Sequence, residues 1–201
     1  MGSKLKAKVK IRGTRPILWH KFGPDAIPLE KQERTGVAGN DPEEWKRSVL
    51  FTKEGQLYLD PSYVFGCFRD AAKYTKKGRG SIMTLVSATL EVGELRVLID
   101  RFIPGFDGGL PEEIPTDCDE PVYLDIRGVR NPSTKGRNVR YRVAASPGWE
   151  AEFTLLWDAT IVNRSQMEAV ANDAGQLVGL ADGRSIGFGR FDVVGFDVEE
   201  L

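Results

Sequence analysis

Residues 4–11 read Lys-Leu-Lys-Ala-Lys-Val-Lys-Ile, an unbroken alternation of lysine and apolar side chains. Successive side chains of a β-strand point to opposite faces, so this pattern predicts a half-buried strand with a cationic outer face. Residues 150–157 alternate in the same way, and residues 191–198 are expected to form a further strand near the C-terminus. Both ends of the chain are therefore predicted to contribute strands.

Two helices are expected between these strands. The first begins at Asp60-Pro61, where Asp suits the N-cap and Pro suits the first helical position, and its apolar spacing continues to about Tyr74. The second begins at Ser165-Gln166-Met167-Glu168, which has the form of a capping box. It is expected to end at Gly179, because glycine suits the position that follows a helix.

More strands are indicated in the middle of the chain. Segments 83–92 and 95–103 look strand-like, and segments 122–129 and 139–143 have the form of a hairpin joined by a basic loop. The resulting order is the β-α-β-β-α-β plan of a ferredoxin-like domain. We therefore predict an α+β fold, with a ferredoxin-like core, an antiparallel sheet and long loop insertions.

The whole chain, residues 1–201, is expected to form a single domain. Residues 21–56 show little periodicity apart from a short possible helix at 42–48, and residues 104–121 are acidic and rich in turn-forming residues. Both stretches are interpreted as insertions or loops within that domain. A ferredoxin-like plan places its first and last strands in one sheet, so the loops beside them are expected to meet.

Composition argues against several classes of protein. Lys and Arg number 28 against 29 Asp and Glu, so the formal net charge of −1 indicates no particular partner. No apolar run approaches the roughly 18–20 residues that span a bilayer, and two scattered cysteines make no disulfide framework. We therefore expect a cytoplasmic protein without a membrane partner. With one histidine and no Walker-type loop, no metal site and no cofactor are expected.

Residues 179–190 read Gly-Leu-Ala-Asp-Gly-Arg-Ser-Ile-Gly-Phe-Gly-Arg and join the second helix to the strand that follows it. Glycines let the backbone approach a ligand closely, and their N–H groups can surround phosphate oxygens. Arg184 and Arg190 add positive charge. A dinucleotide-binding fingerprint would follow a strand and open a helix, which this segment does not do. The alternative interpretation is a helix C-cap and a tight turn.

Cations gather in two runs of the sequence. Five lie with one acid between Arg69 and Arg79, and six lie with no acid between Arg127 and Arg142. Such runs favour a polyanion without base specificity, and bases can stack on the tyrosines among them. The alternative is a solvated surface that protects sheet edges. The predicted nucleic-acid-binding residues are Lys73, Lys76, Lys77, Arg79, Arg130, Lys135, Arg137, Arg140, Arg142, Gly183, Arg184, Gly187, Gly189 and Arg190.

His20 is the side chain best suited to proton transfer near neutral pH. It follows the first predicted strand and comes directly after Trp19. In a functional role it would be a general base or acid at a ribose 2′-hydroxyl or a leaving oxygen. The alternative is a packed or hydrogen-bonded structural histidine. Neighbouring carboxylates at 43–44, 112–113 and 117–120 are interpreted as solvated loop residues.

Gly179-Leu180-Ala181, five further residues and Gly187-Phe188-Gly189 resemble a motif of the RAMP superfamily of CRISPR systems. That motif reads glycine–hydrophobic–glycine, five residues, and glycine–hydrophobic–glycine again. Ala181 departs from it, since the motif has glycine there. The predicted order of elements is also similar to RAMP proteins. Segments 14–20 and 187–191 resemble a family of phage and prophage proteins.

The resemblance implies two kinds of function. RAMP backbone subunits hold a guide RNA without reading its sequence and polymerise along it, whereas processing endoribonucleases of the superfamily cut repeat RNA without metal, often with a histidine early in the chain. The long excursion 21–56 suits the first kind, and His20 suits the second.

We therefore expect a single-stranded nucleic-acid-binding protein that is not an enzyme, with RNA favoured. It would grip the backbone without sequence preference and assemble into an oligomer or larger ribonucleoprotein, in a phage or a CRISPR-type defence system. Two alternatives stay open. One is a metal-independent endoribonuclease that uses His20, and the other is a phage structural or assembly protein whose basic faces contact protein neighbours.

Overall fold

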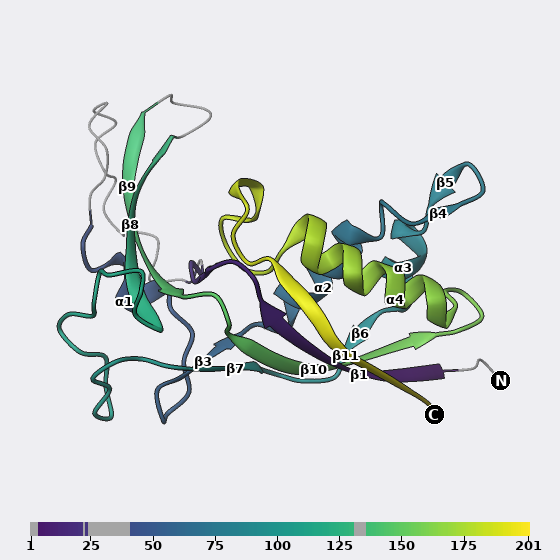
Figure 1. Ribbon diagram of the computed structural model, residues 1–201, viewed down its shortest axis with the longest axis horizontal. Coiled ribbons are helices and arrows are strands. Elements are labelled where there is room, and N and C mark those ends of the chain that lie inside the picture. Colours follow the sequence, from purple (N-terminus) through teal and green to yellow (C-terminus); the bar gives the residue numbers. More distant parts are fainter. Residues whose placement is uncertain (1–3, 22, 24–40, 131–135) are drawn as a thin grey trace. The chain divides into compact units, whose positions relative to one another are not determined.

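The computed structural model describes residues 4–21, 23, 41–130 and 136–201 (Figure 1). They form two compact units. The first comprises the described residues of Met1–Ile17, Tyr58–Asp100 and Pro147–Leu201, and the second comprises those of Leu18–Leu57 and Arg101–Ser146. The expected single domain over 1–201 stays a prediction. Within the described ranges, no helix is long and apolar enough to cross a bilayer.

The first unit is built on an antiparallel sheet with the strand order β11-β1-β10-β7-β3, and β6 also pairs with β10. The leading strand follows from the alternation in its sequence, since Leu5, Ala7, Val9 and Ile11 are all buried. The strands are β1 (Lys4–Gly13), β3 (Gln56–Leu59), β6 (Glu91–Val92), β7 (Val97–Phe102), β10 (Glu150–Asp158) and β11 (Phe191–Glu200).

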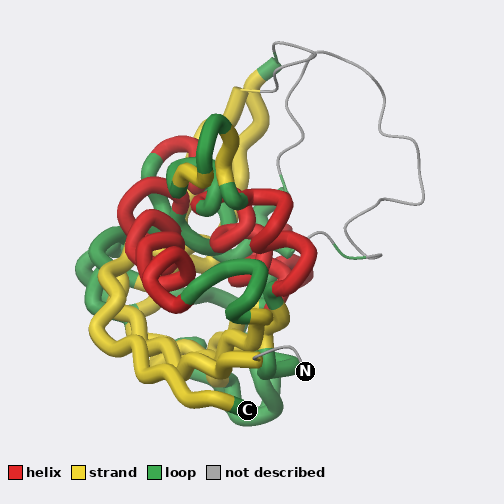
Figure 2. Tube along the Cα trace, turned by 90° about the vertical axis from the view of Figure 1, so that its right-hand side faces the viewer, coloured by secondary structure: helices red, strands yellow, loops and turns green. Residues whose placement is uncertain are grey.

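Helices cover one face of this sheet (Figures 1 and 2). Phe68 of the first long helix packs edge-on against Phe153 of β10, with ring centroids 5.9 Å apart, so the core lies between helices and sheet. The helical segments are α2 (Pro61–Ala71), α3 (Met83–Thr89), α4 (Arg164–Asp173), a π-helix η2 (Ala174–Val178) and a 3₁₀ turn η3 (Arg184–Ile186). A small hairpin of β4 (Lys76–Lys77) and β5 (Gly80–Ser81) follows α2.

The predicted α+β fold with an antiparallel sheet is confirmed. Its core order is β1, α2, β7, β10, α4 and β11, and its strands lie in the order β11-β1-β10-β7, which is compatible with a ferredoxin-like plan. The Asp60 side chain accepts the Ser62 N–H at 3.0 Å and caps α2, as expected. Gly179, with φ of 86°, ends η2.

Two local predictions were wrong. The segment expected as a strand at 83–92 begins with helix α3. Ile82 and Val86 are fully buried while Thr84 between them is exposed, which fits helical spacing, whereas a strand would place all three on one face. The capping box of α4 is Asn163 with Gln166, not Ser165 with Glu168. The Asn163 side chain accepts the Gln166 N–H at 2.9 Å, so the cap lies two residues before the predicted one.

The second unit holds a three-stranded sheet in the order β2-β9-β8 and a short helix, α1. The predicted hairpin is confirmed as β8 (Val122–Arg130) and β9 (Arg137–Ala145), which pair without a register shift. The other elements are β2 (Ile17–Leu18) and α1 (Glu44–Ser48), which lies in the expected excursion 21–56. Residues 104–121 form neither helix nor strand, as expected for a loop.

Candidate nucleic-acid interface

The glycine-rich loop 179–190 is closed by backbone hydrogen bonds. Leu180 N–H donates to Gly189 O at 2.9 Å, and Gly189 N–H donates to Pro16 O at 2.8 Å. A Cβ atom on Gly189, whose φ is 68°, would collide with the Leu180 carbonyl. This glycine therefore serves the close approach of two backbone segments, and the loop is held against the chain that follows β1, as the fold predicted.

A pocket of about 430 Å³ lies where the loop meets the end of β1. Gly187 has φ of 92°, and no atom lies within 4 Å of the position its Cβ would take, so its missing side chain leaves the pocket open. Arg15 and Arg190 bring two guanidinium groups to the lining. The complete lining is Thr14, Arg15, Gln176, Gly187, Arg190, Phe191 and Asp192.

Arg190 is the most constrained of the lining cations. Its carbonyl accepts the N–H groups of Thr14 at 2.8 Å and Arg15 at 3.3 Å, which ties the loop to β1. Its side-chain Nη1 is buried, and none of the described residues accepts a hydrogen bond from it. A buried charged donor without an acceptor is unfavourable, so Arg190 is a position at which the fold leaves a polar group unsatisfied.

Sequence reasoning selected Gly187 and Arg190 but missed Arg15, Thr14, Gln176 and Asp192. Thr14 and Arg15 could have been found from their position, since they directly follow β1 in a loop that was expected to meet residues 180–190. Gln176 is exposed on a π-helix, an element that sequence periodicity does not distinguish from a continuing α-helix. Asp192 was not predicted because the nucleic-acid-binding residues were chosen for positive charge or for glycine.

Arg184 and Gly183 lie on the other side of the same loop. Gly183 takes a left-handed φ of 72° before η3. Arg184 Nη1 lies 3.3 Å from an Asp70 carboxylate oxygen, and Arg69 also pairs with Asp70 at 2.8 Å. The loop therefore meets the start of the first cation run, but one acid is already shared between two arginines there.

The remaining cations of the first run are exposed on and beside the β4–β5 hairpin. Lys73 lies over the Tyr74 ring at 4.7 Å, and Lys77 donates to Ile161 O at 3.4 Å. Lys76 and Arg79 are also exposed. Figure 1 shows this hairpin beyond the end of α4 that is opposite the glycine-rich loop. The first unit therefore carries two separate cationic regions.

The second cation run belongs to the second unit. Arg142 is 4% exposed, and its Nη2 lies 3.0 Å from Asp125, which also pairs with Arg127 at 2.8 Å. Arg142 therefore helps hold the hairpin together instead of facing solvent. Arg130 and Arg137 face each other in the register and are exposed. Lys135 lies outside the described residues.

His20 belongs to a cluster around Glu44. His20 Nε2 lies 3.1 Å from Glu44 Oε1, and their side chains are 23% and 15% exposed. Arg140 pairs with the same oxygen, and the Tyr141 N–H donates to the other oxygen at 3.2 Å. The cluster joins α1 to β9. It also has the form of a histidine oriented by a carboxylate with a cation nearby, an arrangement that can serve proton transfer.

The lysine face of β1 is neutralised by its neighbours. Lys8 lies 2.6 Å and Lys10 3.5 Å from Glu152 of β10, and Lys6 lies 2.8 Å from Glu199 of β11. The hydrogen bond from Lys8 lowers the pKa of Glu152, and the bond to Glu152 raises the pKa of Lys8. The predicted cationic outer face is therefore a ladder of ion pairs, because the adjacent strands supply acids in register.

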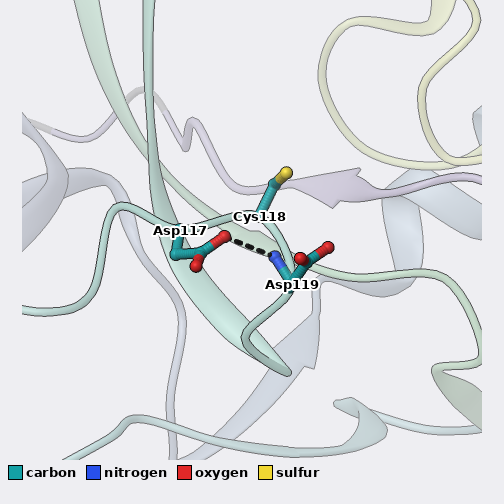
Figure 3. Close-up of side chains that lie close together, drawn as sticks. All are labelled: Asp117, Cys118 and Asp119. Carbon is teal, nitrogen blue, oxygen red and sulfur yellow. Dashed lines mark hydrogen bonds between the residues drawn. The ribbon is translucent and has the colours of Figure 1, made fainter.

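Two other sites carry reactive side chains. Asp117, Cys118 and Asp119 project from one exposed turn, where the Asp119 N–H donates to Asp117 at 3.0 Å (Figure 3). This is the solvated loop that the sequence indicated. Cys67 is buried, which raises the pKa of its thiol to about 12, and the thiol donates to Ala174 O at 3.4 Å. Cys67 is therefore not a nucleophile at neutral pH.

No family model and no curated protein matches the chain. Among solved structures, 118 chains match. One is a chain in the cryo-EM structure of the Type III-B Cmr-beta bound to cognate target RNA, with a TM-score of 0.50 and 11% sequence identity. The match covers 98% of this chain and 61% of the other. The chain thus spans about three-fifths of that neighbour's length and shares its fold.

Proposed function

We propose that this protein binds single-stranded nucleic acid, RNA in preference, without reading the base sequence. The observation that carries the proposal is the pocket at the glycine-rich loop. Arg15, Arg190 and Gly187 all line it, and no atom lies within 4 Å of the position that a Cβ of Gly187 would take. Among the described residues neither guanidinium has an ion-pair partner. Two such groups suit a phosphate oxygen pair, which carries no sequence information.

Exposed cations elsewhere support the same function. Lys73, Lys76 and Arg79 on one unit, and Arg130 and Arg137 on the other, carry no ion pair with a described acid. Each is suited to a phosphate contact that releases counterions. Arg142 is not carried forward into this set, because it is buried against Asp125.

The fold supports a RAMP-type protein in particular. The strand order and the glycine-rich loop before the final strand agree with the RAMP resemblance, and the chain shares the fold of a protein solved with target RNA. On this proposal the protein assembles with copies of itself or other subunits on the nucleic acid, in a phage or CRISPR-type defence system.

The test is an anisotropy titration with a fluorescent 20-nucleotide single-stranded RNA at several salt concentrations. Binding is expected to weaken steeply with salt, and Arg15→Ala should weaken it about tenfold and reduce the salt slope by about 0.7, the value for one lost phosphate contact on a single strand. Lys6→Ala, which removes an ion-paired cation from β1, is the matched control and should change little. Absence of binding at low salt would overturn the proposal.

The His20–Glu44 pair favours a metal-independent endoribonuclease as the second candidate. In its catalysis His20 would take the proton of a 2′-hydroxyl, and the 2′-oxygen would displace the 5′-oxygen of the next nucleotide from phosphorus. The products would be a 2′,3′-cyclic phosphate and a 5′-hydroxyl that has gained a proton. The same RNA, incubated with EDTA and run on a denaturing gel, separates the candidates. Cleavage that His20→Ala abolishes would favour the enzyme, and intact RNA would favour binding alone.

A further inference from the structure

We propose that the pocket at the glycine-rich loop holds one phosphate–ribose unit of an RNA strand, and that Asp192 accepts a hydrogen bond from the ribose 2′-hydroxyl. The protein would then distinguish RNA from DNA at this position. The inference rests on the proposed function and deepens it, since it names what the pocket reads.

The size and charge of the pocket suit such a unit. A volume of about 430 Å³ falls in the range of about 300–1,000 Å³ that small-molecule sites occupy. Arg15, which is exposed, and Arg190, which is half-buried, bring two positive charges to the lining, and these suit a phosphate. The hydroxyl of Thr14 adds a neutral donor to the same lining.

Asp192 needs a separate explanation, because a carboxylate repels a phosphate. It lines the pocket, it is exposed, and among the described residues it has no ion-pair partner. Its neighbour across the strands is Arg12, which instead lies 3.7 Å from Glu150. An ionised carboxylate only accepts hydrogen bonds, so the group it suits is a hydroxyl, as in other sites where an acid binds ribose.

The lining also explains why the base would go unread. Phe191 is 1% exposed and packs against Trp149 at 6.5 Å between ring centroids, so its ring is not available for stacking. The Gln176 amide carries both a donor and an acceptor and therefore suits any base edge. What remains is recognition of sugar and phosphate.

The walls of the pocket are held in place by the surrounding fold. The Trp149 indole N–H donates to Arg15 O at 2.9 Å, and Gly175 packs so closely on Phe191 that a Cβ there would collide with it. A site fixed in this way loses little ordering entropy on binding, and its geometry can discriminate between similar sugars.

The experiment compares three 20-nucleotide uridine strands that differ only at the 2′ position: hydroxyl, hydrogen and fluorine. The fluorinated strand keeps an RNA-like sugar pucker but has no hydroxyl to donate. For the native protein we expect the hydroxyl strand to bind about tenfold more tightly than either of the others, the effect of one hydrogen bond to a charged group. The readout is the affinity ratio between strands.

Asp192→Ala should bring that ratio to about one without weakening DNA binding, since removing a negative charge does not disfavour a polyanion. Asp197→Ala removes the same charge from an exposed position on the same strand and should keep the ratio. Equal binding of all three strands by the native protein overturns the inference and leaves the proposed function standing. Binding of none overturns the proposed function. If the fluorinated strand binds as tightly as the hydroxyl strand, the preference for RNA over DNA comes from sugar shape, and the proposed role of Asp192 is overturned.

Discussion

Ala181 shows how one residue carries backbone strain. It has a left-handed φ of 59°, the one positive φ outside glycine among the described residues, and it stands where the RAMP motif has glycine. A Cβ in this conformation costs roughly 1–2 kcal/mol. The residue is 8% exposed and lies in the loop closed by Leu180 and Gly189, so the surrounding hydrogen bonds hold it there.

Ala181→Gly is therefore expected to raise the free energy of unfolding by about 0.5–1 kcal/mol, since relief of strain exceeds the added entropy of the unfolded chain. The measurement is the urea midpoint. Ala171→Gly in α4 is the control and should lower stability by about 1 kcal/mol or more, because its backbone is helical and its side chain is buried. Equal destabilisation by both changes would contradict a strained position.

Among the elements, the β8–β9 hairpin uses part of a cation run for its own stability, since two of its arginines pair with Asp125. The run 127–142 contains no acid, yet Asp125 lies directly opposite Arg142 in the register and is buried with it. Arg142 is almost fully buried, whereas the second partner of Asp125, Arg127, is 41% exposed, so Arg142 supplies the buried half of this charge cluster. The arginines at the far end of the hairpin are exposed and free of that constraint.

Arg142→Ala should therefore lower the free energy of unfolding by about 2 kcal/mol, as expected for the loss of a buried hydrogen bond to a charged group when Asp125 keeps Arg127 as a partner. Arg137→Ala, at the exposed end of the same strand, should change it by less than about 0.5 kcal/mol but weaken RNA binding. Urea denaturation and anisotropy together make the comparison. If Arg142→Ala is as stable as Arg137→Ala, the pair does not stabilise the hairpin.

At the scale of the whole molecule, net charge and local charge differ. The chain is formally −1, so its copies repel one another weakly, while Lys73, Lys76 and Arg79 are exposed together beside the β4–β5 hairpin. β11 ends the order of its sheet and is ten residues long, so its outer edge offers backbone groups for pairing with another chain. Both features suit copies that gather along one strand of nucleic acid.

We expect the number of bound copies to grow in proportion to strand length. Mass photometry of complexes on 20- and 60-nucleotide single-stranded RNA should give about three times as many copies on the longer strand, because sequence-independent binding fills whatever length is offered. A 60-base-pair duplex is the control and should hold fewer copies. One copy per strand at both lengths would argue against assembly along the nucleic acid.

Secondary structure was predicted correctly from the sequence where the conformation depends on neighbouring residues alone. The alternation of residues 4–11, the Asp60 cap and the Gly179 stop all act within a few residues. Prediction was poor where distant packing prevails. Helix α3 contains β-branched residues that favour a strand locally, but Ile82 and Val86 are buried while Thr84 between them is exposed, a spacing that a helix gives and a strand does not.

For the candidate site, local sequence patterns were enough to identify the glycine-rich loop, Arg190 and the order of elements that brings the loop to β1. The folded chain was needed to show that Arg15 and Asp192 share a pocket with the loop, that Arg142 is buried, and that the lysines of β1 are ion-paired. This is because charges interact through space. Which acid lies within a few ångströms of which cation depends on strand register, and register joins residues that the sequence keeps far apart.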